Sequence, residues 1–242
     1  LEFKSSLLES NKLDEEQINF IKSINYNIDD NRAATLISNL CSFINTAFNQ
    51  RVIILLDEYD TPMTSFWTHR NEDDWATLIF FLRAFFDSTF KDNFLFERAI
   101  ITGITQIFKE SIFSGLNNLF VDTITSMKYS NFFGFTSEEV KEILKNSFLS
   151  YWEDEVIKWY EGYHFGSSKE MYNPWSITSF VNCLKKPSCF WVNTSDNSLI
   201  NDLIRNCSNR IHAALIDLLQ DKTCQFIYQE YISYNDFYNR IE

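Results

Sequence analysis

A run of five apolar residues that ends directly in two acids most limits what this chain can fold into. Residues 52–56 read Val-Ile-Ile-Leu-Leu, and Asp57 and Glu58 follow at once. A short continuous apolar run is typical of a strand that is buried on both faces of a parallel sheet. The sequence therefore predicts a buried parallel strand that carries two carboxylates at its carboxyl end.

Helical and strand-like segments alternate around this run. Scarce Gly (5) and Pro (3) indicate long elements with few tight turns. Helix and buried strand in alternation predict the α/β class, with a doubly wound parallel sheet. The apolar spacing predicts helices over 14–24, 28–48 and 72–90, and a second short strand over 97–103.

The second half of the chain has a different, mostly helical pattern. We expect a boundary near residue 134, with an α/β core over 1–133 and a helical lid subdomain with further helices over 134–242. Thr136 or Ser137 is the expected cap of the first lid helix. The expected helices are 137–148, 152–161, 174–185, 197–205 and 208–220, and 121–129 is a candidate short strand.

Charge and composition exclude several classes of protein. The net charge is −12, and a surface this acidic repels phosphate backbones, so nucleic-acid binding by this chain is not expected. No apolar run approaches 18 residues, so we expect no membrane span. Five irregularly spaced Cys without a C-x-x-C motif indicate free thiols in an intracellular, cytoplasmic protein.

The acidic end of the first strand has a specific chemical interpretation. Apolar residues followed by Asp-Glu form the pattern of a Walker B strand in P-loop ATPases. Asp57 would then hold Mg²⁺ through its water shell, and Glu58 would polarise the water that attacks the γ-phosphate. The equally weighted alternative is a strand that ends in a solvated acidic loop. Asp60 either caps the following turn, which Pro62 sharpens, or joins the acidic site.

Several blocks of sequence support a wider resemblance. From "LLDEYDTPM" the chain resembles the AAA-ATPase-like family of P-loop proteins, which are often fused to a C-terminal PD-(D/E)XK nuclease-like domain. The resemblance spans roughly residues 50–205, and its later blocks follow the order of the family. These blocks read "ITGITQIFKESIFSGLNNLF", "YSNFFGFTSEEVKEIL", "WYEGYHFG", "MYNPWSITSFV" and "FWVNTSDNSLI".

The resemblance implies roles for individual residues. Asp57 and Glu58 match the Walker B pair, and Thr102 falls where a sensor of the γ-phosphate would lie, or else simply closes a strand. Pro174 and Trp175 match a place that lines the adenine pocket in related switch ATPases. In the alternative, Pro174 lies in the first turn of a helix that Asn173 caps, and Trp175 is buried.

Other residues in the shared blocks have a local interpretation or none. We expect a structural role for His164 and a tight loop for the two glycines around "YHF". Residues 109–111 have no role that their chemistry predicts. A structured loop is expected from Ser114, Gly115, Asn117 and Asn118.

The chain departs from the family in one respect. No G-x-x-x-x-G-K-[ST] motif occurs, and no Gly is followed by Lys, so the phosphate-binding loop is absent from these 242 residues. No nuclease-like core is found either: Glu139-Val140-Lys141 fits D/E-x-K but has no partner motif. The start, "LEFKSSLLES", has neither an initiating Met nor the features of a signal peptide.

Two functional hypotheses remain open. In the first, the chain is a fragment of an ATPase that binds and hydrolyses Mg-ATP as a conformational switch once the missing loop is supplied, and this segment alone is inactive. In the second, it is a degenerate pseudo-ATPase that serves as an interaction or structural module for protein partners. A role as a nuclease accessory has no local support.

Overall fold

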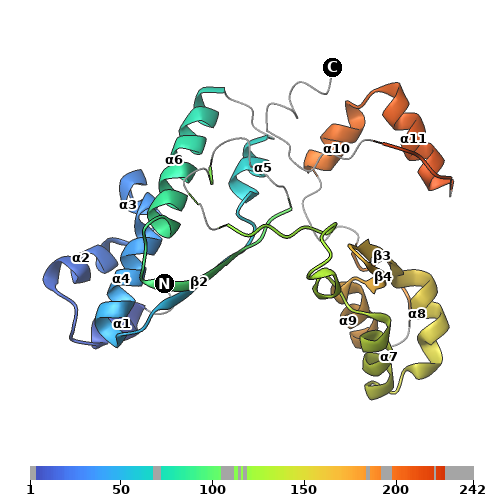
Figure 1. Ribbon diagram of the computed structural model, residues 1–242, viewed down its shortest axis with the longest axis horizontal. Helices are drawn as coiled ribbons and strands as arrows, with labels where there is room; N and C mark the ends of the chain where they lie inside the picture. Colours follow the sequence, from blue (N-terminus) through green and yellow to red (C-terminus); the bar gives the residue numbers. More distant parts are fainter. Residues whose placement is uncertain are drawn as a thin grey trace. The chain divides into compact units, whose positions relative to one another are not determined.

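The computed structural model describes residues 4–67, 72–104, 112–113, 116, 119–183, 186–191, 198–220 and 222–226. The chain forms two compact units (Figure 1). The first unit comprises residues 1–118 and 198–242, and the second comprises 119–197. Each unit is described separately.

From residue 4 onward, where the structure describes the chain, four helices precede the first strand. They are α1 (Lys4–Glu9), α2 (Glu15–Ser23), α3 (Asp30–Ala34) and α4 (Leu36–Phe48). A capping box formed by Asp14 and Gln17 begins α2, close to the predicted start. The helix predicted over 28–48 is instead two helices, because Thr35 leaves the helical conformation and donates its hydroxyl to the carbonyl of Asn31 at 3.1 Å.

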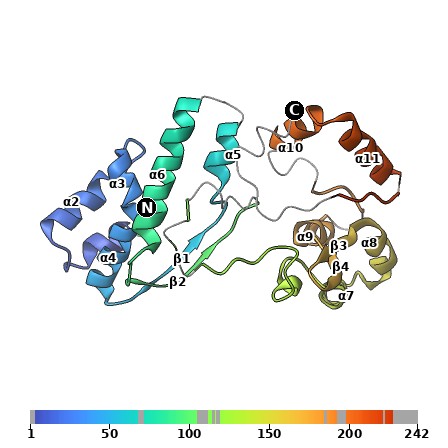
Figure 2. The ribbon, with the colours of Figure 1, turned by 45° about the horizontal axis from the view of Figure 1, so that its top comes forward.

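The core of the first unit is a parallel strand pair with a crossover. Strands β1 (Val52–Leu56) and β2 (Phe96–Ile101) lie side by side (Figure 2). The segment between them contains α5 (Thr61–Trp67) and α6 (Glu72–Phe90). Both predicted strands and the helix over 72–90 are thereby confirmed. The predicted doubly wound sheet is not seen: in the described residues of the first unit, the parallel sheet has two strands.

Aromatic side chains of α6 form the main apolar cluster beside the strands. Phe86 is 1% exposed, and its ring is stacked with that of Phe90 and tilted against that of Phe113. Leu56 of β1 and Ile101 of β2 pack against the same cluster. One face of the sheet is therefore covered.

The opposite face of the strand pair is bare. Ile53 is 59% exposed, Leu55 73% and Ile100 60%. The prediction that this apolar run is buried on both faces is therefore wrong for this chain, because within the described residues helices cover one face only. A parallel sheet with an uncovered apolar face is unusual, since parallel sheets are normally covered on both.

The described residues of the second unit form three α-helices, two short 3-10 helices and a hairpin. Its elements are η1 (Ser130–Phe132), α7 (Ser137–Asn146), η2 (Ser150–Trp152), α8 (Glu153–Tyr160), β3 (Glu161–Phe165), β4 (Ser168–Tyr172) and α9 (Pro174–Asn182). The predicted caps are confirmed: Thr136 forms a capping box with Glu139, and Asn173 caps α9 with Pro174 at its first position.

The hairpin was not expected from the sequence. β3 and β4 pair antiparallel through the segment that the glycines led us to assign as a loop. Gly166 has φ +52° and closes the turn, where an added Cβ would lie 2.0 Å from the carbonyl oxygen of Ser126. The candidate strand over 121–129 is wrong, because this segment consists of turns and irregular backbone.

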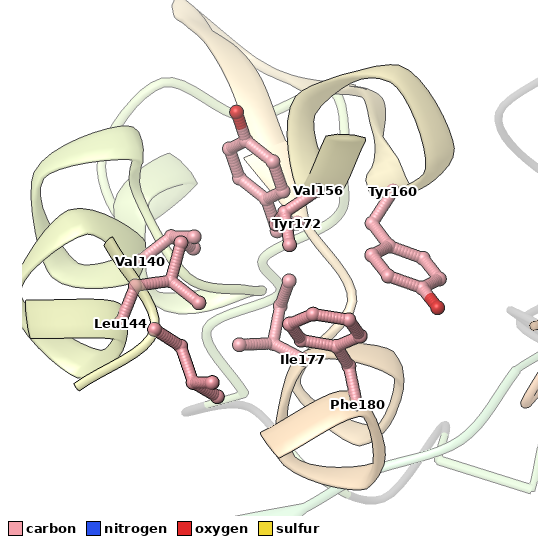
Figure 3. Close-up of a cluster of buried hydrophobic side chains, with 8 residues drawn as sticks. Val140, Leu144, Val156, Tyr160, Tyr172, Ile177 and Phe180 are labelled. Carbon is pink, nitrogen blue, oxygen red and sulfur yellow. The ribbon is translucent and has the colours of Figure 1, made fainter. Parts of the chain in front are cut away.

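The second unit has its own core, which is drawn in Figure 3. The helices α7, α8 and α9 and the hairpin contribute side chains that are at most 7% exposed. The buried members are Val140, Leu144, Leu149, Val156, Tyr160, Tyr172, Ile177 and Phe180.

The remaining helices are α10 (Ser198–Arg205) and α11 (Asn209–Leu219), close to the predicted bounds. Across the described ranges, no helix is both long enough and apolar enough to cross a membrane. All five cysteines are described, and each is a free thiol. Burial raises the pKa of the Cys41 thiol, which keeps it protonated and unreactive.

Truncation of the second core should destabilise the protein strongly. Phe180 is fully buried, so we expect Phe180→Ala to lower the free energy of unfolding by about 3–5 kcal/mol. Phe148 is 89% exposed, and Phe148→Ala should change it by less than about 0.5 kcal/mol. Urea denaturation followed by tryptophan fluorescence measures both. Equal losses in the two variants would show that the core is not the one described.

Candidate functional site

The parallel pairing of β1 and β2 continues past the ends of both strands. The N–H of Thr102 donates to the carbonyl of Leu56 at 2.9 Å, and the N–H of Tyr59 donates to the carbonyl of Thr102 at 3.0 Å. These bonds place the residues after β1 next to those after β2. The hydroxyl of Thr102 donates to Oδ1 of Asp57. Two of the three predicted catalytic residues are thus in direct contact.

Asp57 and Thr102 continue the alternation of the bare sheet face. Leu55 pairs with Ile100 in register, and both side chains are exposed. Since side chains alternate along a strand, residues two positions further on belong to the same face. The exposed Asp57–Thr102 pair therefore lies at the carboxyl edge of the uncovered apolar surface.

Glu58 has an unusual backbone conformation. Its φ is +51°, in the left-handed region that non-glycine residues rarely adopt and that costs about 1–3 kcal/mol. The turn is supported locally: Thr61 donates its N–H to the carbonyl of Glu58 at 3.0 Å and its hydroxyl to Oε2 at 3.2 Å. The side chain of Glu58 is exposed, beside that of Asp57.

Asp60 belongs to the turn rather than to the exposed acidic surface. It is 1% exposed, and its Oδ2 accepts the N–H of Ile104 at 3.1 Å. Its carbonyl accepts the N–H groups of Met63 and Thr64, both at 3.0 Å, at the start of α5. Of the two roles considered from the sequence, the contacts favour the structural one.

Gly103 allows the two strand ends to approach. A Cβ at this position would lie 2.5 Å from the ring of Tyr59 and 2.7 Å from Oδ1 of Asp60. Tyr59 in turn packs edge-on against Phe113 at 5.2 Å between ring centroids. Sequence reasoning did not identify Gly103 as a site residue, although a Gly directly after a strand that faces an acidic turn was a usable signal.

The acidic edge fits one part of a magnesium site. Across the described ranges, no three His, Cys, Asp or Glu side chains lie close enough together to hold a metal ion by themselves. Asp57 is an exposed carboxylate whose orientation the hydroxyl of Thr102 helps to fix. A single fixed carboxylate fits a magnesium ion that keeps most of its waters and takes its other ligands from phosphate oxygens.

Pro174 and Trp175 lie in the second unit, at the start of α9. The side chain of Asn173 accepts the N–H of Ser176 at 3.0 Å and caps the helix. Trp175 is 54% exposed, and its indole N–H donates to the carbonyl of Phe190 at 3.2 Å. The expectation of a buried Trp is therefore wrong, because α9 turns this ring outward.

The remaining sequence candidates are exposed or undescribed. His164 is exposed on β3. The residues 109–111, together with Ser114, Gly115, Asn117 and Asn118, lie outside the described residues.

Two acids of the same turn should respond differently to truncation. Asp60→Ala removes a buried acceptor and leaves the N–H of Ile104 without it, so we expect a loss of about 1–3 kcal/mol in the free energy of unfolding. Asp57→Ala removes an exposed carboxylate and should cost less than about 1 kcal/mol. Urea denaturation of both variants provides the comparison. A greater loss for Asp57→Ala would contradict the division between a structural and an exposed acid.

The part of the chain that carries this site is similar to a known protein family. A family model described as "Predicted AAA-ATPase" (AAA-ATPase-like) matches residues 2–113, which include both parallel strands and the acidic turn. The blocks of resemblance noted beyond residue 113 lie outside that match. No solved structure matches the chain.

A curated relative extends the comparison. The chain is 28% identical over 163 residues to an "Uncharacterized protein in vnfD 5'region" from Azotobacter chroococcum mcd 1. That alignment covers 65% of this chain and 30% of the relative, so the chain spans less than a third of the relative's length. Over residues 2–113 the chain is therefore similar to the AAA-ATPase-like family of predicted AAA-ATPases.

Proposed function

We propose that this chain carries the water-activating edge of a Mg-ATP site and acts as an ATP-dependent conformational switch once a phosphate-binding loop is supplied by a further segment. Asp57 holds the magnesium ion through water, and Glu58 orients the attacking water. Thr102 fixes Asp57 and senses the γ-phosphate. The observation that carries the proposal is the hydrogen bond from Thr102 to Asp57 at the carboxyl edge of two parallel strands.

The location of the acids supports this role. Ligands of open parallel sheets bind beyond the carboxyl ends of the strands, where Asp57, Glu58 and Thr102 lie. Two of these three positions are exposed acids directly after β1, and the backbone of Glu58 is left-handed. Bound magnesium would neutralise phosphate charge and polarise the γ-phosphoryl group at this edge.

The bare face supports the need for a further segment. Ile53, Leu55 and Ile100 expose more than half of their side-chain area on one side of a two-stranded sheet. A two-stranded sheet alone is only marginally stable in water. An additional strand and helix would bury this surface. Such a segment would abut Asp57 and Thr102, which lie at the edge of the same face. The same segment would then supply both the phosphate-binding loop and the layer that covers the bare sheet face.

The helical part of the chain would then act as a lid. In this proposal residues 1–133 form the core and residues 134–242 the lid, with Pro174 and Trp175 lining the base pocket. The exposed indole of Trp175 supports this assignment, since an exposed aromatic ring can stack on a base. Trp175→Ala should then weaken nucleotide binding without changing its magnesium dependence.

Nucleotide binding and hydrolysis test the proposal directly. We expect a fluorescent ATP analogue to bind the full-length natural protein with magnesium and more weakly without it, and to bind the 242-residue chain poorly. Glu58→Gln should lower the hydrolysis rate at least about 100-fold with binding retained, because it removes the group that polarises water. Glu97→Gln, at the opposite end of the same strand pair, is the matched control and should retain activity.

The competing hypothesis gives a different result. A pseudo-ATPase that serves as an interaction module would bind no nucleotide in its full-length form. Thr102→Val provides a further distinction: it should lower hydrolysis in an ATPase and should have no effect on a module that binds only protein. Absence of magnesium-dependent binding by the full-length protein would overturn the proposed function.

A further inference from the structure

The second unit has an aromatic groove that the proposed ATP site does not use. Its volume is about 330 Å³, which is within the range of small-ligand sites. Trp159, Tyr163 and Trp191 each expose 44–49% of their area. The groove is lined by these three and by Tyr160, Phe190, Glu161, Gly162, Asn173, Ser176, Ser188 and Cys189.

Hydrogen bonds fix the walls of this groove. The hydroxyl of Tyr160 donates to the carbonyl of Ser188 at 3.0 Å and accepts the N–H of the same residue at 2.9 Å. The indole of Trp175 donates to the carbonyl of Phe190. Residues 186–191 are thus bonded to both α8 and α9, and the ring of Phe190 lies 6.1 Å from that of Tyr160. The aromatic surface is therefore attached to the helices of the core.

The core positions the tyrosines so that their polar ends leave it. Figure 3 shows the rings of Tyr160 and Tyr172 within the buried cluster and their hydroxyl groups pointing away from it. The hydroxyl of Tyr172 donates to Oε2 of Glu161 at 3.0 Å. Burial, and then the proximity of Glu161, raises the pKa of Tyr172 to about 12. Tyr172 therefore remains a donor at neutral pH and holds this carboxylate in place.

The charged side chain that lines the groove is negative. Among the described residues that line the groove, Glu161 is the carboxylic acid and none is Lys or Arg. Aromatic faces and a carboxylate both attract cations, whereas the carboxylate repels phosphate groups. The net charge of −12 adds a field of the same sign over the whole chain. The groove is therefore better suited to a cation with an apolar surface than to an anion.

We propose that this groove is a binding site for an organic cation of the size of a trimethylammonium group, held by the faces of Trp159, Tyr163 and Trp191 and by the carboxylate of Glu161. The apolar methyl groups of the ligand would contact the rings. Its positive charge would lie near Glu161, whose position Tyr172 fixes. This site is independent of Asp57, Glu58 and Thr102, so the two proposals can fail separately.

Binding of choline to the full-length natural protein tests the proposal, with tryptophan fluorescence and calorimetry as readouts. The neutral isostere 3,3-dimethylbutan-1-ol has the same shape without the charge, and we expect it to bind at least tenfold more weakly. Glu161→Gln and Trp159→Ala should each weaken choline binding at least fivefold. Glu142→Gln and Tyr151→Ala, an exposed acid and an exposed aromatic residue outside the groove, are matched controls and should bind as the unaltered protein does.

Three outcomes would overturn the proposal. Equal affinity for choline and its neutral isostere would mean an apolar groove without charge recognition. Adenosine that displaces choline from the protein and binds the Glu161→Gln variant equally well would mean that the groove stacks bases. No choline binding at millimolar concentration, with circular dichroism showing an intact fold, would mean no cation site. A peptide with one trimethyllysine, compared with free choline, shows whether the cation belongs to a protein partner or to a small molecule.

Discussion

The parallel pairing of β1 and β2 is the constraint on which the rest of the first unit depends. The bonds that join Leu56 to Thr102 and Thr102 to Tyr59 continue this pairing beyond the strands, and so they set where each acid of the turn lies. A one-residue slip in register would move Thr102 to the other face and remove its contact with Asp57. The approach of the two chain segments also requires Gly103, since a side chain there would meet the ring of Tyr59.

The same strand pair leaves the first unit incompletely buried. An apolar layer on one side holds Leu56 and Ile101, but Leu55 and Ile100 on the other side are largely exposed. At roughly 25 cal/mol per Å² of apolar surface, covering such a face is favourable for any segment that fits it. The second unit differs, since its helices and hairpin surround a core of their own. Its stability therefore depends less on further sequence than that of the strand pair.

Local patterns in the sequence predicted much of this arrangement, and long-range ones predicted less. The strand at 52–56, the helix at 72–90 and the caps at Thr136 and Asn173 follow from periodicity and capping chemistry over a few residues. The hairpin β3–β4 was missed because its glycines suggested a loop, and its pairing depends on a turn at Gly166. An apolar run does not indicate whether other elements cover both faces of its strand. The bare sheet face could therefore not be predicted from the sequence. For the site, the acids were visible in the sequence, but the contact of Thr102 with Asp57 required the register.

The acidic turn assigns different physical roles to acids only a few positions apart. Asp60 is buried, where a carboxylate is stable only when hydrogen bonds compensate its lost hydration, and it accepts the backbone N–H of Ile104. Asp57 and Glu58 remain in water, where a carboxylate keeps its charge and can exchange a solvent ligand for a metal ion. An acid that maintains a turn cannot also coordinate a mobile ligand without loosening that turn. The proposed chemistry at this edge therefore uses the exposed pair, and the buried acid supports the turn that carries it.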